Sequence, residues 1–178
     1  GTAVGVTALA TDADTGATIT YSLSDNAGGK FAIGSTTGIV TVASALDYET
    51  ATSHNITVLA TSSDGSTNTG TYTIAVTNIN EAPVITSAAT ASFAENGTGT
   101  VYTATASDVD ASTTLTYGLS GTDSTLFNIN TSTGAVTFKT APNFEAPSDA
   151  GANNVYNIIV SASDGTLTTT QAVAITVT

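Results

Sequence analysis

The sequence predicts an all-β chain of two tandem β-sandwich domains with about seven short strands each. Three features predict this class: the chain repeats itself once, its apolar residues alternate with polar ones in short runs, and turn residues separate the runs. A length of 178 residues is enough for two small domains. A content of 40% hydrophobic residues is typical of a globular protein rather than a disordered one.

The internal repeat emerges when the chain is shifted by 96 positions, which aligns Tyr21 with Tyr117 and Phe31 with Phe127. We expect these recurring aromatic residues in the two cores. The halves match over a long span until a small insertion near 146–154. Since one copy has about the length of a β-sandwich domain, the expected bounds are 1–77 for the first domain, 78–83 for a linker and 84–178 for the second domain.

Each copy contains short runs in which Val, Ile, Tyr and Thr alternate with small polar residues, as in half-buried strands. No stretch shows a helical period. In the first copy the runs lie at 4–8, 19–23, 39–42, 56–58 and 72–76. In the second copy they lie at 101–106, 115–119, 136–138, 156–160 and 172–177. We therefore expect antiparallel strands packed as two sheets in each domain.

The two copies differ at their start. A leading segment at 84–96 precedes Gly97 in the second copy, whereas the first copy begins directly at the equivalent Gly1. The first domain is therefore expected to lack its N-terminal strand. Either the chain is an excerpt of a longer array, or a neighbouring chain donates the missing strand and so builds a fibre.

The charge of the chain is almost entirely of one sign, with 14 acidic residues against 2 basic ones and a net charge of −12. Such a surface repels nucleic acid and anionic membranes and attracts cations. The absence of cysteine excludes disulfides and thiolate metal sites. No apolar run approaches ~18 residues, so no membrane insertion is expected.

The linker region at 76–83 reads V-T-N-I-N-E-A-P and carries Asn78, Asn80 and Glu81. Its final dipeptide, Ala82-Pro83, is expected to be extended and stiff, because proline fixes its own φ and restricts the residue before it. A stiff linker rich in oxygen donors, between two acidic loops, indicates a joint braced by a metal ion.

Six motifs resemble the calcium motifs of cadherin repeats, in family order and over nearly the whole chain. They are T-D-A-D (11–14), L-D-Y-E (46–49), N-I-N-E-A-P (78–83), F-A-E-N (93–96), S-D-V-D (107–110) and S-A-S-D-G (161–165). The chain is most similar to the cadherin-like domains of very large bacterial surface proteins and adhesins. This resemblance implies Greek-key, immunoglobulin-like sandwiches of the cadherin type.

The resemblance also implies calcium ions between consecutive domains, held from both sides. For the middle joint it implies Asp47, Glu49, Asn78, Glu81, Asp108, Asp110 and Asp164 by side chain, with Asn80 by its carbonyl. For a half-site at the top of the first domain it implies Asp12, Asp14 and Asp64. For a half-site at the base of the second domain it implies Glu95, Asn143 and Glu145.

The chemistry of these residues agrees with calcium, which takes 6–8 oxygen ligands. Of the 14 acidic residues, only Asp25, Asp123 and Asp149 fall outside the implied positions. A scattered solvated surface would not show such clustering. Asn78 and Asn143 stand where the family usually has Asp, and Ala82 stands where it often has Asn. We therefore expect roughly two or three ions at the joint.

The function that the resemblance implies is a non-enzymatic structural or adhesive repeat module outside the cell or on its surface. Its joints would be stiffened by calcium, and its partners would be neighbouring repeats or identical chains in a rod or fibre. The alternative is a carbohydrate-binding module for a polysaccharide, with Tyr48 and Tyr102 as its best exposed aromatic candidates. The single histidine, His54, aligns with Tyr156 at the start of a strand, so no catalytic set is expected.

Overall fold

A computed structural model describes residues 1–110 and 113–178. The described chain divides into two compact units, Gly1–Ile79 and Asn80–Thr178. Within these residues the only helical element is a 3-10 turn, η1 (Ser124–Leu126), and no described helix is long and apolar enough to cross a membrane. The expected fold class, all-β, is therefore confirmed. The domain and linker bounds expected from the sequence stay a prediction.

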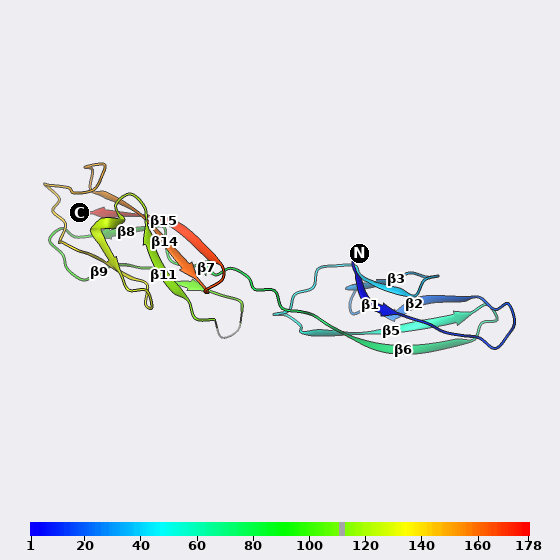
Figure 1. Ribbon diagram of the computed structural model, residues 1–178. Coiled ribbons are helices and arrows are strands. Elements are labelled where there is room, and N and C mark those ends of the chain that lie inside the picture. The colour runs from blue at the N-terminus through cyan, green and yellow to red at the C-terminus, as the bar shows by residue number, and fades with distance from the viewer. Residues whose placement is uncertain (111–112) are drawn as a thin grey trace. The chain divides into compact units, whose positions relative to one another are not determined.

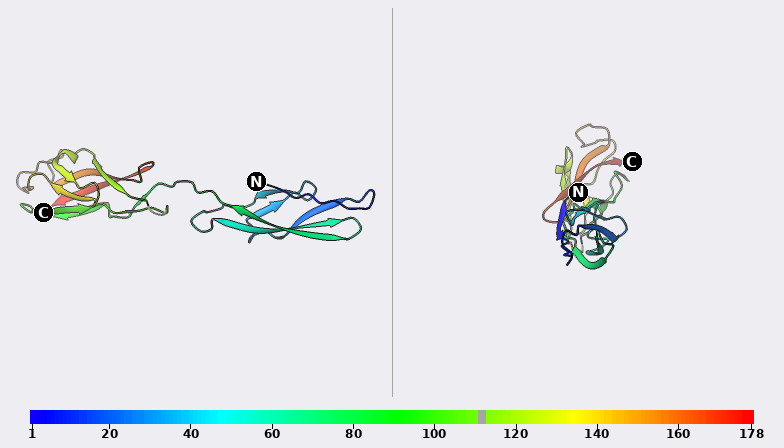
Figure 2. Two further views of the ribbon diagram at one scale, coloured as in Figure 1. Left: turned by 60° about the horizontal axis from the view of Figure 1, so that its bottom comes forward. Right: turned by 90° about the vertical axis from the view of Figure 1, so that its right-hand side faces the viewer.

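Unit 1 is built of strands that form two sheets, with the orders β1-β4-β3 and β2-β5-β6 (Figure 1). The strands are β1 (Ala3–Thr7), β2 (Ile19–Asp25), β3 (Phe31–Ile33), β4 (Ile39–Val42), β5 (Ser53–Ser62) and β6 (Thr67–Ala75). All neighbouring strands pair antiparallel. The longest pairing is the β5–β6 hairpin, whose two strands run side by side in the left view of Figure 2.

The core of unit 1 lies between its two sheets. Phe31 and Val40 come from one sheet, and Ile56 and Val58 come from the other; all four are at most 3% exposed. Alternation along each strand directs one set of side chains inward and the other outward, which is why a period of two predicted the sandwich. His54 lies in β5 and packs edge-to-face on Phe31, a structural position as expected.

Unit 2 has three sheets, with the orders β11-β14-β15-β8, β12-β13-β9 and β10-β7. The first strands are β7 (Val84–Ile85), β8 (Thr90–Phe93), β9 (Thr100–Thr103), β10 (Ala106–Ser107) and β11 (Thr116–Ser120). The remaining strands are β12 (Phe127–Ile129), β13 (Ala135–Phe138), β14 (Val155–Ser163) and β15 (Thr168–Val177). One pairing, between β8 and β15, is parallel.

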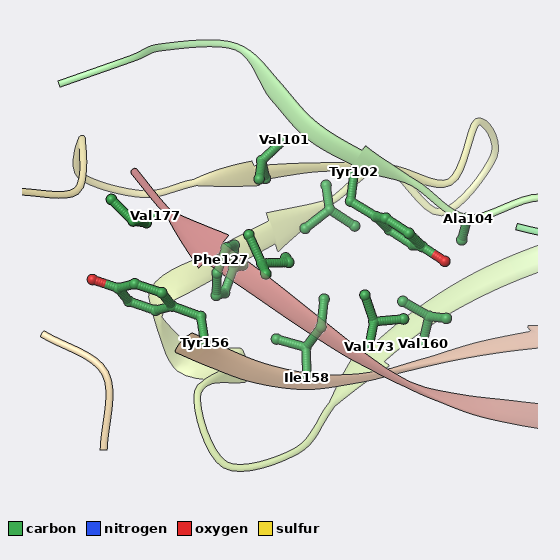
Figure 3. Packing of buried hydrophobic residues seen from close by; sticks show 11 residues of the cluster. Val101, Tyr102, Ala104, Phe127, Tyr156, Ile158, Val160, Val173 and Val177 are labelled. Atoms are coloured by element: carbon green, nitrogen blue, oxygen red, sulfur yellow. The ribbon is translucent and has the colours of Figure 1, made fainter. Parts of the chain in front are cut away.

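The core of unit 2 is larger and is filled from both main sheets (Figure 3). Tyr156, Ile158 and Val160 project from β14 at every second residue, and each is at most 1% exposed. They meet Phe127 and Val136 from the opposite sheet. The expected core position of Phe127 is therefore confirmed.

Two local features recur in both units and explain part of the sequence repeat. Gly38 and Gly134 have φ values of 66° and 71°, and a Cβ at either would collide with the carbonyl oxygen of Ala8 or Ala104. Only glycine tolerates both the left-handed backbone and the close approach. The hydroxyls of Tyr21 and Tyr117 likewise accept hydrogen bonds from matching backbone amides.

The units differ at the edge of one sheet. In unit 2, β8 adds a fourth strand beside β15, whereas the matching sheet of unit 1 has three described strands. Donation of a strand by a neighbouring chain stays a prediction. The leading segment of unit 2 also covers Tyr102, which is only 7% exposed, so the expectation that Tyr102 is an exposed sugar-binding aromatic is wrong.

Candidate metal centre

Three of the predicted ligands meet at one end of unit 1. Asp12 and Asp14 lie in the loop between β1 and β2, and Asp64 lies in the turn of the β5–β6 hairpin. One carboxylate oxygen from each lies within 4.8 Å of the others. The backbone amide of Asp14 donates to Asp12 Oδ1 at 2.9 Å, and that of Ser66 donates to Asp64 Oδ1 at 2.8 Å. These short-range bonds fold each loop around its own carboxylate.

We name Asp12, Asp14 and Asp64 the upper cluster, and local donors favour the charged form of two of its members, Asp12 and Asp64. The Ser62 hydroxyl and the Asp14 amide lower the pKa of Asp12 below its ordinary value. The Ser66 amide lowers the pKa of Asp64, although the charge of Asp12 acts in the opposite direction. Carboxylates this close repel one another, and a bound cation would remove that repulsion.

Unit 2 gathers five of the predicted ligands at the end where its chain begins. This joint-side cluster consists of Asn80, Glu81, Asp108, Asp110 and Asp164. Asn80 Nδ2 donates to Asp164 Oδ2 at 2.7 Å, and the Glu81 amide donates to Asp110 Oδ2 at 3.0 Å. The Asp110 amide donates to Asp108 Oδ1 at 2.9 Å. Asn80 thus contacts the cluster through its side-chain amide, and a ligand role for its carbonyl stays a prediction.

The second oxygen of Asp108 distinguishes this cluster from an ordinary acidic surface. Asp108 Oδ2 is buried and has no hydrogen-bond partner among the described residues. A buried polar atom without a partner costs free energy, and native structures usually pair such atoms with protein, water or an ion. The cluster offers carboxylate oxygens from Asp108, Asp110 and Asp164, and Asn80 and the Leu167 amide lower the pKa of Asp164. Such a donor set suits calcium.

Unit 1 carries the remaining expected joint ligands, which are Asp47 and Glu49 of the first domain and Asn78 of the linker. Asp47 accepts hydrogen bonds from the Thr50 hydroxyl at 2.8 Å and the Thr50 amide at 3.1 Å, and these bonds lower its pKa. Glu49 lies in the same turn, and both Glu49 and Asn78 are exposed. The grouping of these residues with the joint-side cluster stays a prediction.

The lower half-site of unit 2 is organised around the backbone of Phe144. Glu95 Oε2 accepts the Phe144 amide at 3.0 Å, which places this carboxylate beside Asn143 and Glu145 in the chain. Asn143 Oδ1 in turn accepts the Glu145 amide at 2.9 Å. The structure therefore brings Glu95, which is distant in sequence, to the loop that carries the other two predicted ligands.

Two acidic residues outside the predicted set have a structural task that the sequence did not reveal. Asp123 is 3% exposed and accepts the amides of Ala150 and Asn157 at 2.8 and 2.7 Å. Asp149 is 5% exposed and accepts two further amides in its own loop. Together they hold the insertion near 146–154. This insertion has no counterpart in the first copy, and that was the one signal in the sequence that it needs an anchor of its own.

Known proteins are similar to this chain in sequence and in fold. Residues 1–77 match the cadherin domain family. The chain is 35% identical to mouse Protocadherin Fat 4 over 136 residues, 71% of the chain, and 35% identical to the Drosophila Protocadherin-like wing polarity protein stan over 176 residues, 89% of the chain. It spans only 3% and 5% of the length of these two relatives.

Solved structures agree. Mouse cadherin-23 EC22-24 is 30% identical, with a TM-score of 0.66 over 90% of this chain and 52% of that chain. Human protocadherin-24 EC1-2 has a TM-score of 0.72 over 98% of this chain and 87% of that chain; at 23% identity it supports the fold alone. Residues 1–77 therefore belong to the cadherin domain family, and unit 2 is built of the same kind of β-sandwich.

Proposed function

We propose that this chain is an extracellular adhesive repeat module whose acidic ends bind calcium ions that brace one repeat against the next. Cadherin repeats are adhesion modules, so the chain is not an enzyme. The observation that carries the calcium proposal is Asp108 Oδ2, a buried carboxylate oxygen that finds no donor among the described residues and lies in the joint-side cluster.

The residues that would hold the ions are the predicted ones. At the joint, Asp108, Asp110 and Asp164 would supply carboxylates from unit 2, and the linker would supply Asn80 and Glu81. Asp47, Glu49 and Asn78 would complete the shell from unit 1. A bound ion would neutralise the repulsion between carboxylates and would tie the linker to both units. The departures from family ligands, such as Asn78, favour fewer ions than a full set.

The location follows from the ion. Calcium is millimolar outside cells and scarce inside, so a module that needs it works outside the cell. The net charge of −12 keeps such a module soluble and away from anionic surfaces. The relatives found come from mouse, fly and human, so an origin in a bacterial surface protein rests on the sequence motifs alone.

The proposed partners are neighbouring repeats or identical chains in a rod or fibre. A polysaccharide is less favoured, because one of its two aromatic candidates, Tyr102, is buried. Light scattering of the chain at high concentration tests the fibre version, since a strand-donating chain forms oligomers. A strictly monomeric chain would remove strand donation and leave the calcium-braced rod.

Thermal unfolding in millimolar calcium and in a chelator, at equal ionic strength, tests the calcium proposal. Ligands that bind only the folded state stabilise it by ~4 kcal/mol at a thousandfold excess over Kd. We therefore expect calcium to raise the midpoint by many degrees. Identical midpoints in both buffers would show that these acidic clusters hold no calcium in this chain.

A further inference from the structure

The leading segment of unit 2, Val84–Phe93, changes sheets partway along its length. Its first strand, β7, pairs antiparallel with β10, and its second strand, β8, pairs parallel with β15 (Figure 1). Between them, residues 86–89 pass from one sheet to the other and leave the regular ladder. Backbone groups at such a crossover need other partners, because buried unpaired carbonyls are costly.

Side chains from two different strands supply those partners. The hydroxyl of Tyr102, on β9, lies 2.7 Å from both Ser87 Oγ and the Ala88 carbonyl oxygen. Gln171 Nε2, on β15, donates to the Ser87 carbonyl at 2.9 Å and lies 3.5 Å from the Tyr102 hydroxyl. The carbonyl of Ala89 accepts the Ala174 amide at 3.0 Å. Three consecutive carbonyls of the crossover are thus satisfied, two of them by side chains.

The rest of the Tyr102 side chain is fixed by packing. It is 7% exposed and belongs to the main apolar cluster of unit 2. In Figure 3 its hydroxyl leaves that cluster on one side, while the hydroxyl of Tyr156 leaves it on the other. A ring locked in the core therefore holds its hydroxyl at a fixed place over the crossover.

Unit 1 has neither of these side chains. The register of β1 places Val6 where unit 2 has Tyr102, and the register of β6 places Gly70 where unit 2 has Gln171. The pair is thus a feature of unit 2 and not a requirement of the sandwich itself.

We propose that Tyr102 and Gln171 form a latch that keeps Val84–Phe93 in its own unit and prevents its exchange with a second copy of the chain. The segment is an edge with only two antiparallel and four parallel residue pairs, and short edge strands of this kind open and swap readily. The latch acts at the point where the ladder is interrupted. It needs no calcium and is therefore independent of the proposed joint.

The test measures amide hydrogen exchange and oligomeric state of the whole chain, in chelator, for Tyr102→Phe, Gln171→Ala and the double variant. Tyr102→Phe keeps the ring in the core and removes only the hydroxyl. We expect exchange of the amides in Val84–Phe93 to be about tenfold faster in each single variant, because partly buried acceptors of the crossover lose their donors. In the double variant we expect a dimer at high concentration by light scattering.

The matched control is Tyr156→Phe, which removes a hydroxyl that contacts Ser148 in another part of unit 2. It should leave exchange in Val84–Phe93 at the wild-type rate. Unchanged exchange in Tyr102→Phe would overturn the latch, as would equal acceleration by Tyr156→Phe. A double variant that opens faster yet stays monomeric at every concentration would overturn the role against exchange between copies.

Discussion

The chain uses aspartate in two opposite ways within one fold. Asp123 and Asp149 are buried, and their carboxylate oxygens accept backbone amides from the insertion near 146–154 and from Asn157 in β14. Asp12, Asp14 and Asp64 lie in loops at an end of unit 1, and their carboxylates face one another within 4.8 Å. Among the described residues, the first pair meets only donors of the protein's own backbone. In the second group Asp12 and Asp64 each accept a backbone amide as well, but their carboxylates also face like charges.

This difference, rather than burial, separates the anchors from the proposed ligands. A buried carboxylate is stable when hydrogen-bond donors surround it, and it then has no need of an ion. Asp108 lies between the two types: Oδ1 accepts the Asp110 amide, but Oδ2 is buried and has no donor in the part of the chain that the structure describes. By the donor criterion Asp108 belongs with the proposed ligands.

The largest effect is expected when an anchor is removed. Asp123→Ala leaves the amides of Ala150 and Asn157 without the acceptor that they meet in a partly buried place, which should lower the free energy of unfolding by about 3 kcal/mol. Denaturant unfolding should show the same loss in calcium and in chelator. Asp25→Ala is the control, since Asp25 is exposed and accepts a single amide; its effect should stay within ~0.5 kcal/mol. A loss that vanishes in calcium would reclassify Asp123 as a ligand.

A smaller and calcium-specific effect is expected at Asp108. Asp108→Asn keeps an oxygen that can accept the Asp110 amide but removes the charge. Calcium should bind at least tenfold more weakly, which is ~1.4 kcal/mol, while the midpoint in chelator should hardly change. Isothermal titration calorimetry measures the calcium affinity, and thermal unfolding measures the midpoint in chelator.

Asp25→Asn provides the matched control, because Asp25 Oδ1 accepts the Ala27 amide at the same 2.9 Å without any cluster around it. It should change neither calcium affinity nor the midpoint. If both variants changed calcium affinity equally, Asp108 would be no different from an isolated acidic residue in a turn, and the proposed ligand role would be wrong.

Replacing calcium by magnesium should give a still smaller response. Magnesium demands a near-octahedral shell at short distances and keeps its water, whereas calcium tolerates irregular shells of carboxylates and carbonyls. Loops closed by their own backbone bonds, as at Asp12 and Asp64, suit the irregular shell. At equal concentration we expect magnesium to give less than roughly half of the calcium shift in midpoint. Equal shifts would indicate general charge screening instead of a site.

The sandwich was predictable because its signal is local and periodic, but strand lengths were not. The apolar run at 56–58 predicted a short strand, whereas β5 extends over Ser53–Ser62. Backbone pairing with β6 reaches from Ser53 to Thr61, and the polar side chains at these two ends carry no signal of burial. The leading segment of unit 2 likewise forms two strands in different sheets, because its crossover depends on residues far away in the sequence.

The candidate site was predictable where ligands occur as motifs. Asp12, Asp14 and Asp64 come together although the last is distant in the chain, because a hairpin turn lies beside the first loop. Asp123 could not be assigned in this way, since its partners lie 27 and 34 positions away and share no period with it. A single acidic residue has the same appearance in sequence whether it anchors a loop or binds an ion.

The smallest expected effect concerns the titration of a proposed ligand, Asp164. Asn80 is the main cause of its lowered pKa, so Asn80→Ala should move the pKa of Asp164 upward, toward the ordinary value of 3.8. A carboxyl whose pKa is lowered on folding stabilises the fold fully above that ordinary value, and this stability is lost as the pH falls through the lowered one. Asn80→Ala should therefore weaken the acid dependence of stability in chelator, but only slightly, because solvent screens an exposed pair.

Carbon-detected NMR of the carboxyl group measures the pKa directly, with Asp47, held by Thr50 instead, as the internal control. If the two carboxyls shift together, Asn80 acts through the fold as a whole, and the contact at 2.7 Å is not what keeps Asp164 charged for an ion.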